Sequence, residues 1–173
     1  MTASCTQYGV PNDSSSEIND IYNSIQTVAL ETLIDHRFIL AVMIQESGGC
    51  VRAPTSNYGV RNPGLMQDHN GAGTCNSDIT KKVLNPCPTA QILTMIREGA
   101  AGTASGDGMA QCMNEASDAT DRVYYKAARI YNSGSIAASG NLEDGIGTHC
   151  YASDIANRLT GWVSAKHSCT FDS

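Results

Sequence analysis

Seven cysteines lie along the whole length of this 173-residue chain, and they restrict its possible folds more than any other feature of the sequence. They are Cys5, Cys50, Cys75, Cys87, Cys112, Cys150 and Cys169. Their spacing lacks the C-x-x-C pairs of metal clusters and favours disulfide bonds between distant segments, which persist in oxidising compartments. We therefore expect a secreted protein. Three disulfides would leave one thiol free or available to another molecule, and the sequence alone leaves the pairing open.

The length and charge of the chain exclude several classes of function. The length fits one domain, residues 1–173, with a polar N-terminal extension over 1–16 and a core over about 17–166. A net charge of -6 argues against binding to nucleic acid, which requires a basic surface. No apolar run reaches the ~18–20 residues that span a bilayer, and the first residues lack the charged start and apolar core of a signal peptide. We expect a monomer that works without a membrane, a metal or a cofactor.

Hydrophobic spacing predicts a mainly α-helical fold. Ser14-Ser15-Ser16-Glu17 has the form of a capping box that opens an amphipathic helix. Asp35 can cap a second helix over 36–46, which is apolar nearly all round and therefore expected at the centre of the protein. Three later helices are expected through Ile92–Ile96, over about 115–131 and over about 149–166.

The segment 47–88 is the least regular part of the chain and is rich in glycine, proline and asparagine. It is too long for a plain connection, and loops of this length are commonly functional or held by covalent links. Cys50, Cys75 and Cys87 could provide such links. The segment also has room for a small β-hairpin within 50–70.

One acid, Glu46, ends the apolar run of the second predicted helix. Burial beside apolar side chains and the negative end of the helix dipole both disfavour the carboxylate anion, so we expect a raised pKa. A carboxyl that keeps its proton near neutral pH can act as a general acid on an ether-like bond. The alternative is that Glu46 closes the helix and points into solvent, which is the more common role of a helix-terminal glutamate.

Four motifs follow one another in a specific order along the chain. They are E-S at 46–47, G-L-M-Q at 64–67, Y-N-S-G at 131–134 and T-H-C-Y-A at 148–152. In this order and spacing the chain resembles the goose-type lysozymes and soluble lytic transglycosylases of the lysozyme-like superfamily, over about residues 36–163. The resemblance implies a lysozyme-like helical fold with a substrate groove, and cleavage of β-1,4 bonds between N-acetylated amino sugars.

The resemblance also implies roles for individual residues. Glu46 falls on the catalytic acid of the family, and Tyr151 falls on an aromatic residue that packs near it. The residues expected to bind substrate are Ser47, Met66, Gln67, Tyr131, Asn132 and Tyr151. Amide and phenol groups suit this task because they hydrogen-bond a neutral sugar without charge. For some of these residues a purely structural role stays open: core packing for Met66, helix packing for Tyr131 and a helix C-cap for Asn132.

The second carboxylate of a glycosidase is not evident in the sequence. Glycosidases usually employ two carboxylates, but residues 47–63 contain neither aspartate nor glutamate. After G-L-M-Q the acid is Asp68, one position earlier than in the family pattern, where this chain has His69. Asp68 is therefore the candidate base that activates water, and Asp78 and Asp107 are alternatives on loops.

These observations predict a secreted muramidase that hydrolyses the bond between N-acetylmuramic acid and N-acetylglucosamine in peptidoglycan, with Glu46 as general acid and Asp68 as base. If no carboxylate faces Glu46, a lytic transglycosylase that forms anhydro-sugars remains possible. A chitinase and a non-catalytic glycan-binding protein are further alternatives. A sequence pI near 5.0 predicts better action on anionic walls at mildly acidic pH.

Two other site types lack a supporting signature. A thiol hydrolase would use Cys50 or Cys150 with a histidine, but disulfide bonding is the simpler role for these cysteines. The four histidines show neither the H-E-x-x-H motif nor the paired spacing of a zinc site.

Overall fold

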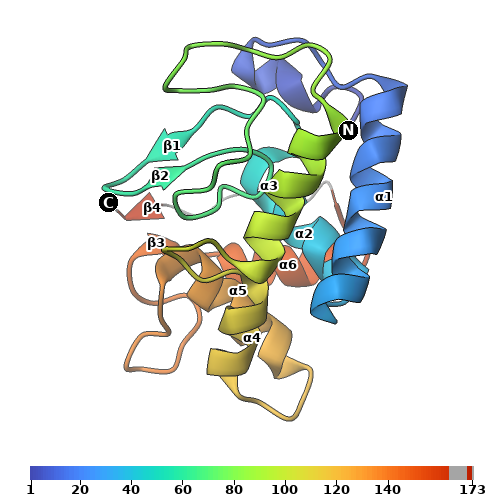
Figure 1. The fold of residues 1–173 in the computed structure, drawn as a ribbon. Coiled ribbons are helices and arrows are strands. Elements are labelled where there is room, and N and C mark those ends of the chain that lie inside the picture. The colour runs from blue at the N-terminus through green and yellow to red at the C-terminus, as the bar shows by residue number, and fades with distance from the viewer. Residues whose placement is uncertain (164–170, 173) are drawn as a thin grey trace.

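The computed structural model of the protein describes residues 1–163 and 171–172, and these residues are mainly helical (Figure 1). The helices of the described chain are α1 (Ser15–Thr32), α2 (His36–Ser47), α3 (Thr89–Ala101), α4 (Met109–Ala116), α5 (Arg122–Ser133) and α6 (Tyr151–Leu159), preceded by a 3-10 helix, η1 (Ser4–Tyr8). The antiparallel strand pairs are β1 (Ser56–Asn57) with β2 (Arg61–Asn62), and β3 (Gly147–Thr148) with β4 (Phe171–Asp172). The prediction of a mainly α protein with a hairpin inside 50–70 is confirmed. Among the described residues, none of the helices combines the length and the apolar character needed to cross a membrane.

Local capping interactions place the first two helices as the sequence predicts. The side chain of Ser14 accepts a hydrogen bond from the backbone N–H of Glu17, and the Glu17 carboxylate accepts one from the backbone N–H of Ser14. Asp35 caps α2 by accepting a hydrogen bond from the backbone N–H of Arg37. α2 packs against α1, α3 and α6, and it contributes Phe38 to the buried core. α2 is therefore the central helix that the apolar run predicts.

The prediction of one helix over 115–131 is wrong. The chain instead forms α4, which begins at Met109, and α5, which begins at Arg122. Ser117 adopts a left-handed backbone with φ 42 at the end of α4, and Asp118 then accepts hydrogen bonds from the backbone N–H and the hydroxyl of Thr120. This local turn competes with helix continuation. The predicted last helix, over 149–166, is also too long, because α6 ends at Leu159 and residues 164–166 lie outside the described part.

Disulfides hold the irregular segment after α2, as the cysteines at 50, 75 and 87 predict: Cys50 joins it to η1, and Cys75–Cys87 closes a loop within it. The cysteines that form them in the described residues are Cys5 with Cys50, Cys75 with Cys87, and Cys150. Cys112 is a free, buried thiol on α4, whereas Cys169 lies outside the described part. The Cys5–Cys50 bond fixes η1 to the chain immediately after α2.

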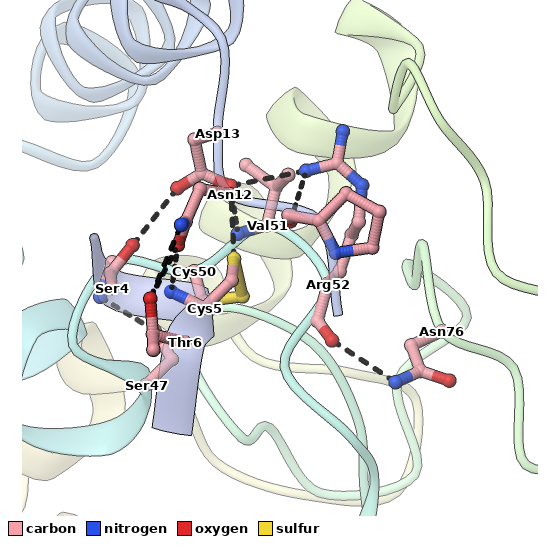
Figure 2. The surroundings of a disulfide bond; sticks show 12 residues. Ser4, Cys5, Thr6, Asn12, Asp13, Ser47, Cys50, Val51, Arg52 and Asn76 are labelled. Atoms are coloured by element: carbon pink, nitrogen blue, oxygen red, sulfur yellow. Dashed lines mark hydrogen bonds and ion pairs between the residues drawn. A yellow bond between two sulfur atoms is a disulfide. The ribbon is translucent and has the colours of Figure 1, made fainter. Parts of the chain in front are cut away.

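A buried arginine organises the start of the irregular segment 47–88. Arg52 is fully buried, and its guanidinium pairs with the carboxylates of Asp13, at 3.3 Å, and Glu17. Its Nε also donates to the backbone carbonyl of Leu84 at 2.9 Å. Figure 2 shows this arginine beside the Cys5–Cys50 disulfide, with Asp13 between them. Charge pairing at this depth fixes the loop without regular secondary structure, since each buried charge requires its partner.

Candidate active site

Glu46 lies in the last turn of α2, where the helix meets a large cleft. The helix stops because Gly48 adopts a left-handed backbone, with φ 66, and its N–H bonds back to the carbonyl of Ile44. The Glu46 side chain is partly exposed and lines a cleft of about 1360 Å³. An acid at the end of the most apolar helix is thereby presented to a space that can hold an extended ligand.

Segments from distant parts of the sequence form the walls of this cleft. The β1–β2 hairpin and β3 lie on the same side of the helical body (Figure 1), and residues of both line the cleft. The other contributing segments are η1, the turn after G-L-M-Q, the loop 103–107, α4 and the end of α5. Among the described lining residues, Glu46, His69 and Asp107 carry ionisable acidic or imidazole groups, and none is a lysine or arginine. The cleft therefore presents both polar and apolar groups, and its ionisable groups give it a neutral to acidic character.

Burial controls the protonation of Glu46. Burial raises the pKa of this carboxyl and a hydrogen bond from Tyr151 lowers it by a smaller amount, so that the pKa moves from 4.5 to about 7. The Tyr151 hydroxyl donates this bond to Oε1 at 2.5 Å from the first turn of α6. Tyr151 is itself buried, and its own pKa is raised well above the usual value, mainly by burial, so it remains a donor. Glu46 can thus carry a proton near neutral pH while one of its oxygens is held in place.

The turn formed by G-L-M-Q orients Gln67 along one wall. Gln67 has a left-handed backbone, with φ 48, and its amide nitrogen donates to the carbonyls of Pro54 and Gly64 at 3.1 and 2.9 Å. A Cβ at Gly64 would lie 2.5 Å from the sulfur of Met95, so the turn requires glycine there. Within the described residues the Gln67 amide oxygen has no hydrogen-bond partner, which leaves it available to a ligand.

Tyr131 and Asn132 form the opposite wall at the end of α5. The Tyr131 hydroxyl donates to the carbonyl of Met66 at 2.9 Å and so connects the two walls behind the cleft. The Asn132 amide oxygen accepts from the backbone N–H of Thr148 at 2.9 Å, which attaches β3 to α5. Both residues line the cleft together with Gln67 and Glu46. These four side chains come from the motifs singled out in the sequence, and the structure brings them together.

Three other residues expected at the site lie inside the protein. Ser47 is fully buried, where its hydroxyl donates to the carbonyl of Met43 at 3.0 Å. Met66 is also fully buried. It packs so closely on α3 that a Cβ added at Gly99 would lie 2.3 Å from the Cβ of Met66. Asp68 is 4% exposed and does not line the cleft. All three lie behind the walls rather than on them, and Tyr151, also expected to bind substrate, is buried and does not line the cleft either.

The burial of Asp68 has an electrostatic consequence. Its pKa is raised from 3.8 to about 8, chiefly by burial and secondarily by the negative charge of Glu98, with Arg61 acting in the opposite direction. Neither carboxyl oxygen has a hydrogen-bond partner among the described residues. Asp78, another sequence candidate, pairs with Arg61 at 2.8 Å and also lies outside the cleft lining. The third candidate, Asp107, does line the cleft, as does His69.

Sequence reasoning missed several residues of the cleft. Tyr8 reaches it from η1, and its presence depends on the pairing of Cys5 with Cys50, which the sequence leaves open. Tyr58 in the β1–β2 hairpin and Ile146 before β3 also line the cleft, with exposed fractions of 73% and 69%. An exposed aromatic residue at a hairpin tip is the kind of signal that could have indicated a ligand surface.

Metal-type ligands in the described residues gather in one place, formed by Cys5, Asp13 and Cys50. The two sulfurs are joined in a disulfide, so this group offers no thiolate to a metal ion.

Comparison of the chain with models of known protein families, with curated proteins and with solved structures gives no match. Functional assignment therefore depends on the site geometry together with the motifs in the sequence.

Proposed function

We propose that this protein is a secreted glycoside hydrolase of the lysozyme-like superfamily, a muramidase that cleaves β-1,4 bonds between N-acetylmuramic acid and N-acetylglucosamine in peptidoglycan. The observation that carries the proposal is Glu46: a carboxyl with a pKa of about 7 that faces a large cleft from the end of the central helix. The helical body, the order of the four motifs and the disulfides support the same assignment.

In the proposed reaction, Glu46 donates its proton to the glycosidic oxygen as the bond to the anomeric carbon breaks. Tyr151 acts as a positioning residue, because its hydroxyl holds one carboxyl oxygen and supports the anion that remains after proton transfer. The amide oxygen of Gln67 and the amide nitrogen of Asn132 make no hydrogen bond within the described residues, and they can bind the sugar's N-acetyl and hydroxyl groups from the two walls.

A water molecule then completes hydrolysis by attacking the anomeric carbon, and a base is needed to accept its proton. Asp68 was the candidate on sequence grounds, yet its carboxyl lies behind the wall. Asp107 and His69 both line the cleft, and we propose that one of them activates the water. If neither acts, attack by the muramic acid's own hydroxyl would give an anhydro-sugar instead.

Chitin is a second candidate substrate, favoured by the absence of lysine and arginine from the described cleft lining. Such a lining offers no ion pair to the carboxylates of peptidoglycan, whereas chitin is uncharged. A chitinase would use Glu46 in the same role.

Clearing of bacterial walls by the wild type and by Glu46→Gln tests the proposal. Glu115→Gln is the matched control, since Glu115 is an exposed residue of α4 that does not line the cleft. We expect the wild type and Glu115→Gln to clear the walls at equal rates and Glu46→Gln to be inactive. A fully active Glu46→Gln variant would refute the assignment.

A further inference from the structure

We propose that the N-terminal segment is a working part of the cleft, in which Tyr8 forms a subsite for an N-acetylhexosamine ring beside Glu46 and the Cys5–Cys50 disulfide holds that subsite in place. This inference rests on the proposed function and adds to it. The segment lies outside residues 36–163, over which the chain resembles lysozyme-like proteins.

The attachment of η1 to the end of α2 is extensive. Cys5 and Cys50 are both fully buried, with Cα atoms 5.0 Å apart, and with Ala53 they form a small apolar cluster on which Tyr8 packs. Figure 2 shows the short helix lying against the turn that follows Ser47, with the disulfide between the two segments. A Cβ at Gly48 would lie 3.0 Å from Nε2 of Gln7, so η1 contacts the helix end that presents Glu46.

Hydrogen bonds fix the same segment from its other side. The backbone N–H of Cys5 donates to the side-chain oxygen of Asn12 at 3.1 Å, and the hydroxyl of Ser4 donates to the carboxylate of Asp13 at 3.2 Å. Asp13 is held in turn by the backbone N–H of Val51 at 3.2 Å. These contacts make η1 a rigid support instead of a loose terminus.

Tyr8 is placed on this support where it can meet a ligand. It is half-buried: its packing on the disulfide cluster covers part of the ring, and the rest lines the same cleft as Glu46. The two side chains are close enough for the negative charge of Glu46 to add to the effect of burial in raising the pKa of Tyr8. In the described residues the Tyr8 hydroxyl makes no hydrogen bond.

This combination suits a sugar ring. An anchored aromatic face packs against the apolar C–H face of a pyranose at little entropic cost, and a free phenol hydroxyl can donate to a ring hydroxyl or an N-acetyl carbonyl. Within the described part of the chain, neither lysine nor arginine lines the cleft around Tyr8, which favours a neutral N-acetylhexosamine unit over the carboxylate of a neighbouring lactyl group or peptide.

Binding of the uncharged pentamer of β-1,4-linked N-acetylglucosamine, measured by calorimetry, tests the subsite. Glu46→Gln is the parent, so that the ligand is not cleaved. Adding Tyr8→Ala is expected to weaken binding about 5- to 30-fold, since a packed aromatic ring contributes at the level of ~1–2 kcal/mol and ~1.4 kcal/mol is tenfold. Adding Tyr22→Ala is the matched control, because Tyr22 is an exposed tyrosine of α1 away from the cleft, and binding should stay unchanged.

The same binding experiment tests the role of the Cys5–Cys50 disulfide. Replacing Cys5 and Cys50 together by serine should weaken binding as much as Tyr8→Ala does, and combining the changes should add nothing further, because both remove the same subsite. Circular dichroism establishes which variants remain folded, and Tyr8→Ala decides the question if the cysteine variant does not.

The outcomes separate this inference from the proposed function. If the parent binds the pentamer and Tyr8→Ala binds it equally well, the subsite is overturned while the function stands. If the parent binds no pentamer and the wild type degrades neither walls nor chitin oligomers, the proposed function is overturned together with the subsite that depends on it.

Discussion

Replacement of Tyr151 by phenylalanine should move the pH range in which the enzyme works. The Tyr151 hydroxyl donates a 2.5 Å hydrogen bond to Glu46 that lowers its pKa, and the pKa of about 7 is what remains after this bond opposes the larger effect of burial. A hydrogen bond to a charged group is worth about 1.5–3 kcal/mol, which corresponds to about 1–2 pH units. Without this bond the Glu46 carboxyl should hold its proton to about pH 8–9.

The assay is the pH profile of kcat/KM on chitin oligomers or walls, whose alkaline limb reports loss of the proton from the general acid in the free enzyme. The wild type should lose activity through about pH 7, and a rate that still rises above pH 7 would contradict Glu46 as acid. In Tyr151→Phe the alkaline fall in kcat/KM should occur at a higher pH, even if the maximal rate of the variant is lower. Tyr131→Phe is the matched control, because the Tyr131 hydroxyl bonds to the carbonyl of Met66 and not to Glu46. An unmoved or lowered limb in Tyr151→Phe would refute the reasoning.

Three further predictions concern buried groups. The folded protein keeps a proton on Glu46 up to about pH 7, whereas the unfolded chain loses it from pH 4.5 upward. Between these pH values the unfolding free energy of the wild type should therefore fall by about 3 kcal/mol relative to that of Glu46→Gln. Urea denaturation measures both, and the same pH dependence in the two proteins would contradict this prediction. Asp68 also keeps its proton in the folded protein, so Asp68→Asn should become more stable than the wild type as pH rises from 4 toward 8. Its wall-clearing rate should be retained, because Asp68 does not line the cleft. Loss of clearing in a folded variant would show that Asp68 is catalytic after all. Cys112 is buried, and burial is the main reason that the pKa of its thiol is raised to about 12. A thiol reagent at pH 8 should therefore label Cys112 only after unfolding. Rapid labelling of the native protein would contradict its buried position.

Local interactions explain how much of the fold could be predicted from the sequence. The capping box of Ser14 with Glu17 and the cap at Asp35 act over two or three residues, so spacing alone locates the starts of α1 and α2. The break between α4 and α5 was missed because it depends on the left-handed conformation of Ser117 and the turn at Asp118, which the apolar spacing does not contain.

Some residues of the candidate site could be predicted from local motifs, and others depend on the tertiary structure. Glu46 and Gln67 could be located from their motifs, and both line the cleft. Asp68 was predicted as the base, but it lies behind the wall while His69 lines the cleft; the sequence does not reveal this, because it depends on the left-handed backbone at Gln67 that redirects the chain. Tyr8 was out of reach for another reason: only the tertiary pairing of Cys5 with Cys50 brings the N-terminus to the cleft.

The most direct test of the central claim is mass spectrometry of the products that wild type and Glu46→Gln release from purified peptidoglycan. The proposed hydrolysis predicts fragments with reducing ends from the wild type and from Glu115→Gln, and none from a folded Glu46→Gln variant. Anhydro ends would keep Glu46 as the acid and replace hydrolysis by transglycosylation. Equal fragment release by wild type and Glu46→Gln would contradict the assignment of Glu46, and with it the proposed function.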